Sequence, residues 1–209
     1  YQFLLPGVYS YDFKTFLDVG LDGDYDLIVA QFSGPNMGLK FWENTGTSTN
    51  PVFVQQTDWA LNSVCEHSSC GVSTGHFDSD QCLDLLVFGS NTQEMYKQTT
   101  VSGPNAIFNA TKTNWLIGSG LPAMDDTFLS IAFGDVDNDG DDDAVYGSPT
   151  GAIEYYERTM IEPPKWERRY SITEWSLASS SDFGQGLRPS LFDYDNDGDV
   201  DLIMGTLNK

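Results

Sequence analysis

Carboxylates recur at a nearly constant spacing in four nine-residue segments of this chain. The segments begin at residues 18, 76, 135 and 193, so successive copies are 58, 59 and 58 residues apart. The two complete copies, 135–143 and 193–201, carry aspartate at loop positions 1, 3, 5 and 9 and glycine at position 6. A period of this size predicts stacked supersecondary units, each of which presents one acidic loop.

The chemistry of the loop favours a hard divalent cation. Carboxylates this close repel one another or take up protons unless a cation neutralises them. Calcium accepts six to eight oxygens in a forgiving geometry, whereas magnesium requires a near-ideal octahedron. No group of cysteines or histidines accompanies the complete loops, which disfavours zinc and copper. A solvated acidic turn is the alternative, because Asp-Gly is a common turn pair, but four copies in register favour calcium.

Short apolar runs follow each loop, and short strand-like segments precede them, so each loop is predicted to be the tip of a β-hairpin. Position 12 is not a glutamate in any copy, which argues against an EF-hand. An aromatic segment comes next, at 41–45, 95–99 and 155–159, and a tryptophan closes each unit, at Trp59, Trp115 and Trp175. The pattern predicts an all-β chain built from four-stranded units, with the repeated aromatics packed between neighbouring units.

The acidic hairpin and its repeat length resemble the FG-GAP/VCBS calcium-binding repeats, which build the β-propeller heads of integrin α subunits. The segment 41–53 also resembles the outer-strand segment of VCBS repeats. The resemblance covers nearly the whole chain. It implies that residues 1–209 form a single β-propeller segment, with three full four-stranded blades and the first hairpin of a fourth. The propeller as a whole would have the seven blades usual in that family.

In that family, the side chains at positions 1, 3, 5 and 9 and the carbonyl at position 7 hold the ion. Carried over, the ligands in the third loop are Asp135, Asp137, Asp139, Asp143 and the carbonyl of Asp141, and those in the fourth are Asp193, Asp195, Asp197, Asp201 and the carbonyl of Asp199. The first loop supplies Asp18, Asp22, Asp26 and the carbonyl of Asp24, and Gly20 occupies its position 3. The second loop supplies Asp78, Asp80, Asp84 and the carbonyl of Cys82. In the second loop, His76 stands at position 1 and Gln81 at position 6. We expect Ca²⁺ in the third and fourth loops, weaker binding in the first, and the weakest or none in the second.

The net charge and the cysteines indicate which partners the protein can bind and in which compartment it works. The formal net charge of −21 opposes binding to nucleic acid. The sequence shows no run that would span a membrane and no signal peptide. Cys65 and Cys70 bracket a short loop that suits a disulfide, although three pairings with Cys82 are open. Asn109 begins the one N-glycosylation sequon. Together with calcium, these features predict an extracellular or cell-surface location.

No catalytic pattern accompanies the loops. The two histidines, His67 and His76, lie in the cysteine loop and in a loop position, and no nucleophile elbow, zinc-protease motif or phosphate loop is present. We expect a non-enzymatic module for adhesion, protein–protein interaction or surface assembly. Two alternatives are a lectin-like propeller that binds glycans and a non-catalytic domain of a larger secreted enzyme. Expected partners are further blades of the same polypeptide or another subunit, because apolar residues near both ends suit burial.

Overall fold

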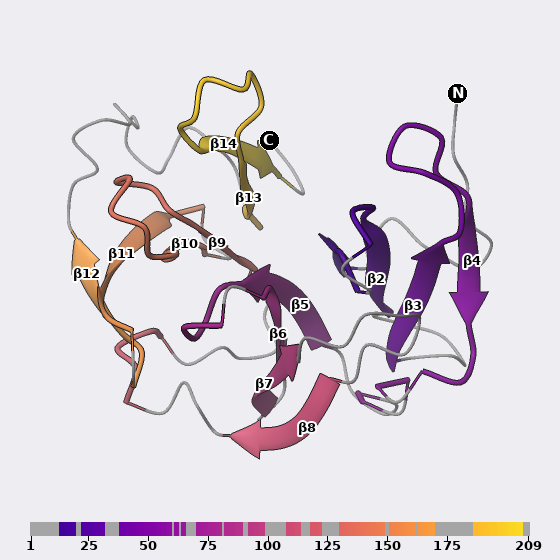
Figure 1. Ribbon diagram of the computed structural model, residues 1–209. Coiled ribbons are helices and arrows are strands. Elements are labelled where there is room, and N and C mark those ends of the chain that lie inside the picture. Colours follow the sequence, from indigo (N-terminus) through magenta and orange to yellow (C-terminus); the bar gives the residue numbers. More distant parts are fainter. Residues whose placement is uncertain are drawn as a thin grey trace. The chain divides into compact units, whose positions relative to one another are not determined.

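A computed structural model describes most of the chain (Figure 1). The described residues are 13–19, 22–31, 38–59, 61–62, 64–65, 70–80, 82–89, 92–98, 108–113, 118–122, 130–148, 151–161, 163–169 and 186–206. Several predicted features lie outside them, namely Gly20, His67, Gln81, Trp115, Trp175, the side chain of Asn109, the apolar segment at residues 1–5 and Leu207.

All the regular secondary structure in the described residues is β-strand. The strands are β1 (Phe13–Leu17), β2 (Asp26–Gln31), β3 (Gly38–Asn44), β4 (Phe53–Gln56), β5 (Cys70–Gly75), β6 (Asp84–Gly89), β7 (Thr92–Gln98), β8 (Phe108–Thr113), β9 (Ser130–Gly134), β10 (Asp143–Gly147), β11 (Ile153–Met160), β12 (Lys165–Arg169), β13 (Arg188–Phe192) and β14 (Asp201–Gly205). The predicted all-β class is therefore confirmed. The described part of the chain contains no helix that is long and apolar enough to cross a lipid bilayer.

The strands form four sheets, in each of which consecutive strands are neighbours. Three sheets have four strands, in the orders β1-β2-β3-β4, β5-β6-β7-β8 and β12-β11-β10-β9, and the fourth contains β13 and β14. The acidic loops connect β1 to β2, β5 to β6, β9 to β10, and β13 to β14. Each loop is therefore the tip of a hairpin between adjacent strands, as the flanking apolar runs predict.

The chain divides into two compact units, one made of Tyr1–Thr74 and Cys82–Thr113 and the other of Gly75–Gln81 and Asn114–Lys209. In the first unit, the β1–β4 sheet packs on the β5–β8 sheet through one apolar cluster. Its buried members are Phe13, Leu17, Val19, Ile28, Ala30, Leu39, Phe41, Leu61, Cys70, Val72, Leu85, Val87 and Tyr96. The aromatic residues Phe41 and Tyr96 of the predicted repeat thus contribute to packing between sheets.

Close backbone approach joins the sheets of the second unit. A Cβ atom on Gly134 of β9 would lie 3.2 Å from the Cβ of Leu191 of β13, so glycine lets these strands approach each other. Phe133 stacks edge-on against Phe77, with ring centroids 4.7 Å apart, and lies 6.0 Å from the ring of Trp166. In the second unit, glycine on β9 allows close approach to β13, and aromatic rings of the β9–β12 sheet pack on one another and on Phe77 of the second loop.

One disulfide joins Cys65 to Cys70, with the two Cα atoms 6.2 Å apart. The predicted pairing is confirmed. Cys82 is buried and takes no part in this bond.

Candidate metal centres

The first aspartate of three loops holds the turn by accepting two backbone hydrogen bonds. In the third loop, Oδ1 of Asp135 accepts from the amide of Asp139 at 3.0 Å, and Oδ2 accepts from the amide of Gly140 at 2.9 Å. Asp18 and Asp193 make the same pair of bonds in the first and fourth loops. The carboxylate therefore stabilises the loop through hydrogen bonds that do not require an ion.

Two loop positions have left-handed backbone conformations. The glycine at position 6 has φ of 91° in Gly23, 94° in Gly140 and 100° in Gly198, as its sequence position predicts. At position 4, Asn138 and Asn196 have φ of 59° and 60°, a role that sequence reasoning missed. The signal was present in both complete loops, because asparagine is among the few L-residues that tolerate this conformation.

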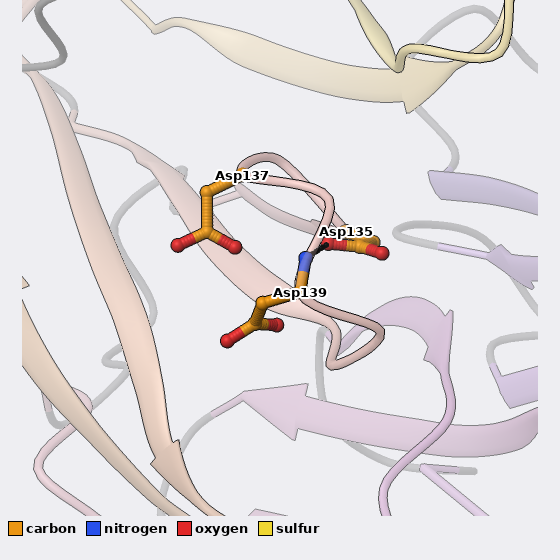
Figure 2. A group of neighbouring side chains, drawn as sticks. All are labelled: Asp135, Asp137 and Asp139. Carbon is orange, nitrogen blue, oxygen red and sulfur yellow. Dashed lines mark hydrogen bonds between the residues drawn. The ribbon is translucent and has the colours of Figure 1, made fainter.

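These bends gather the carboxylates at positions 1, 3 and 5 of the third loop (Figure 2). Asp135, Asp137 and Asp139 each offer an oxygen, and these oxygens lie within 4.8 Å of one another. The fourth loop arranges Asp193, Asp195 and Asp197 in the same way. Two oxygens bound to one Ca²⁺ at about 2.3–2.6 Å can be at most about 5 Å apart, so both triplets fit a single ion of that size.

The other two loops lack such a triplet among the described residues. In the first loop, Gly20 supplies no side chain at position 3. In the second, His76 stands at position 1, and its amide donates to Oδ2 of Asp142, in the third loop, at 2.6 Å. Within the second loop, Asp78 accepts a hydrogen bond from the amide of Asp80 at 2.9 Å. The structure thus groups ligands in the two loops whose sequences are complete.

The aspartate at position 9 has a second task that sequence reasoning missed. Asp26, Asp84 and Asp143 are buried, and their Oδ1 atoms accept backbone hydrogen bonds from the third strand of their own sheets. The donors are the amides of Asn44 at 2.7 Å, Gln98 at 2.9 Å and Arg158 at 2.7 Å. The predicted ligand at position 9 therefore also connects the loop to the sheet.

Several carboxyl groups of the acidic loops have raised pKa values. Burial, reinforced by neighbouring Asp139, raises the pKa of Asp137, and neighbouring Asp197 raises the pKa of Asp195. Burial raises the pKa of both Asp26 and Asp143 to about 6, although each accepts backbone hydrogen bonds that favour its charged form. A bound cation would relieve this cost, because it favours the ionised carboxylates.

The metal-free protein should consequently become less stable as pH rises. Since the pKa values of Asp26 and Asp143 are about 6 in the folded state, above the ordinary value of 3.8, their protonated forms favour folding. This contribution is full below about pH 4 and is lost as pH rises through about 6, by at most roughly 3 kcal/mol per carboxyl. Thermal melts in EGTA between about pH 4.5 and 7.5 measure the trend.

Asp143→Asn, which cannot titrate, should flatten the pH dependence, while the exposed Asp58→Asn should leave it unchanged. A melting temperature in EGTA that climbs with pH would contradict the proposed balance between burial and hydrogen bonding.

No protein-family model matches the chain. The assignment of a metal centre therefore depends on the geometry of the loops themselves.

Proposed function

We propose that this chain is an extracellular, calcium-stabilised segment of a β-propeller that serves adhesion, protein–protein interaction or surface assembly. The observation that carries the proposal is the pair of aspartate triplets at hairpin tips, at one repeat period from each other. Successive four-stranded antiparallel sheets with packed faces support the propeller architecture. We assign the chain no catalytic reaction.

The role of calcium in this proposal is structural. Each ion would be bound by the carboxylates at positions 1, 3, 5 and 9 and by the carbonyl oxygen at position 7. Oδ1 of the position-5 residues, Asp139 and Asp197, already accepts from the position-7 amide at 3.0 Å in each loop, which holds the loop in its curved form. Binding would then require little rearrangement, so metal affinity would add to the stability of the hairpin.

The location is supported by the same features. A disulfide between Cys65 and Cys70 persists in oxidising compartments and is rare in the cytosol. Calcium at extracellular concentrations would keep such loops occupied. The strongly acidic composition fits a protein that works in the presence of divalent cations.

Calcium titration tests the metal assignment. Isothermal calorimetry of the chelated protein should show binding to the third and fourth loops, with weaker binding to the first. Asp139→Asn should remove one binding event, because it deletes a carboxylate from the triplet. Asp58→Asn, an exposed acidic residue outside the loops, is the matched control and should bind calcium like the unchanged protein. Titration heats that Asp139→Asn leaves unaltered would refute the third-loop site.

The fourth sheet supports a role in assembly. Phe192 precedes the fourth loop as Leu17 precedes the first, and Ile203 stands two residues after Asp201 as Ile28 does after Asp26. Leu17 and Ile28 are fully buried against the β5–β8 sheet, whereas Phe192 is 43% exposed and Ile203 is 46% exposed. We propose that a further sheet, from the same polypeptide or another subunit, covers this face of β13 and β14.

Light scattering of residues 1–209 in calcium measures this tendency. We expect a mass above that of one chain, because association would cover the exposed parts of Phe192 and Ile203, and burial of apolar surface stabilises by roughly 25 cal/mol per Å². The double variant Phe192→Ser/Ile203→Ser should shift the mass towards a single chain. Val54→Ser, at an exposed valine of β4, is the control and should not. A sharply melting monomer of the unchanged chain would argue against the proposed partner.

A further inference from the structure

The start of the second acidic loop is held by side chains from the third repeat. Its first residue is His76, so it lacks the carboxylate that accepts two amides in the first, third and fourth loops. Among the described residues, the side-chain oxygens of Asp78, Asp80 and Asp84 do not form a triplet like those of the third and fourth loops. Calcium therefore does not fit this loop as it fits the third and fourth.

A buried arginine contacts the start of this loop instead. Arg158 on β11 is only 3% exposed, and its guanidinium donates to the carbonyl of His76 at 2.6 Å and to that of Phe77 at 2.9 Å. It also donates to the carbonyls of Met160 and Ile161 and lies over the ring of Trp166, 5.4 Å from the centroid. All these partners are carbonyls or an aromatic face, which suit a planar cation.

The neighbouring repeat shows that the position is built for this contact. Gln98 corresponds to Arg158, because each donates its backbone amide to the position-9 aspartate of its own loop. The Gln98 side chain likewise reaches back to the preceding loop, where Nε2 donates to the carbonyl of Asp18 at 2.8 Å. In the third sheet the neutral amide is replaced by a charged group, opposite the loop that has lost its first carboxylate.

Asp142, in the third loop, contacts the first residue of the second loop. Its Oδ2 accepts from the backbone amide of His76 at 2.6 Å and lies 3.1 Å from Nδ1 of the same residue. The Asp142 carbonyl in turn accepts from Nε1 of Trp166 at 3.1 Å. The amide and the carbonyl of His76 are thus both bound by residues of the third repeat.

We infer that the second loop takes no calcium and is locked instead by Arg158 and Asp142, which act as a built-in replacement for the ion. The lock itself follows from these contacts alone. Its contrast with the metal-dependent loops rests on the proposed function. Chelation should then loosen the third and fourth loops and leave the second in place, because Asp142, near the end of the third loop, stays anchored through its own carbonyl to Nε1 of Trp166.

Hydrogen exchange of the whole chain tests the lock directly. In EGTA, protection should fall in the amides of 135–143 and 193–201 but persist in those of 76–80. Arg158→Gln, which copies the residue of the neighbouring repeat, should speed exchange of 76–80 roughly tenfold or more, in calcium and in EGTA alike, since bonds to a charged group are lost. Arg168→Gln, at an exposed arginine paired with Glu154, is the control and should leave 76–80 unchanged.

Two exchange results would overturn the lock. One is loss of protection in 76–80 on chelation, as large as that in 135–143. The other is an Arg158→Gln protein that folds and keeps that protection.

Counting bound calcium after equilibrium dialysis keeps the inference testable if Arg158→Gln does not fold. Asp139→Asn should lose one ion per chain, and Asp80→Asn, at the same loop position in the second loop, should lose none. Loss of an ion in Asp80→Asn would overturn the inference. If neither variant changes the count, the calcium proposal fails for the third loop, while exchange of 76–80 still decides the lock.

Discussion

Asp143→Ala is expected to cost about 3–5 kcal/mol of folding free energy in calcium-free buffer, because it leaves buried donors unsatisfied at about 1–3 kcal/mol each. Asp143 is 1% exposed and accepts three hydrogen bonds. Their donors are the amide of Arg158 at 2.7 Å, the hydroxyl of Tyr155 at 2.8 Å and the amide of Val136 at 3.3 Å. The carboxylate thus ties the loop to two positions on β11. Urea unfolding monitored by tryptophan fluorescence provides the measurement.

Asp201→Ala is the matched control, since it removes the same loop position from the fourth hairpin. Asp201 is half-buried and accepts from the amide of Tyr194 at 2.8 Å. The expected cost is about 1 kcal/mol. Equal losses for the two variants would show that burial of the position-9 aspartate does not decide its contribution. Calcium-free conditions matter here, because both residues are also proposed ligands.

Chelation is expected to lower the melting temperature by more than any exposed point substitution. An ion that binds only the folded chain stabilises it by about 2.7 kcal/mol per site when calcium exceeds its dissociation constant a hundredfold. The third and fourth loops would each contribute this amount. Calorimetric scans in millimolar calcium and in EGTA measure the difference at one pH.

Two comparisons make the chelation result specific to the loops. Asp139→Asn should reduce the difference between calcium and EGTA by about one site's share, while Asp58→Asn should preserve it. If the unchanged protein melts at the same temperature in calcium and in EGTA, calcium has no structural role, even if the ion binds weakly.

The hairpins, the all-β class and the members of each acidic loop could be predicted from local sequence patterns. Asp135, Gly140 and their equivalents act within nine residues, so local spacing and backbone preference sufficed to predict the turn. The Cys65–Cys70 pair was predictable for the same reason, because five residues of separation leave little freedom. Strands followed from apolar runs bounded by turn residues, a pattern that does not require knowledge of the partner strand.

Contacts between residues that are distant in the chain could not be predicted from these local patterns. The family resemblance predicts a metal ligand at position 9, whereas the structure adds that the Oδ1 atom of Asp143 accepts from an amide on β11, fifteen residues away. Arg158 reaches the second loop, which precedes it by about eighty residues, and no local pattern in the sequence connects the two. Such contacts depend on how strands pair and sheets stack, and those arrangements result from burial summed over many residues rather than from any one motif.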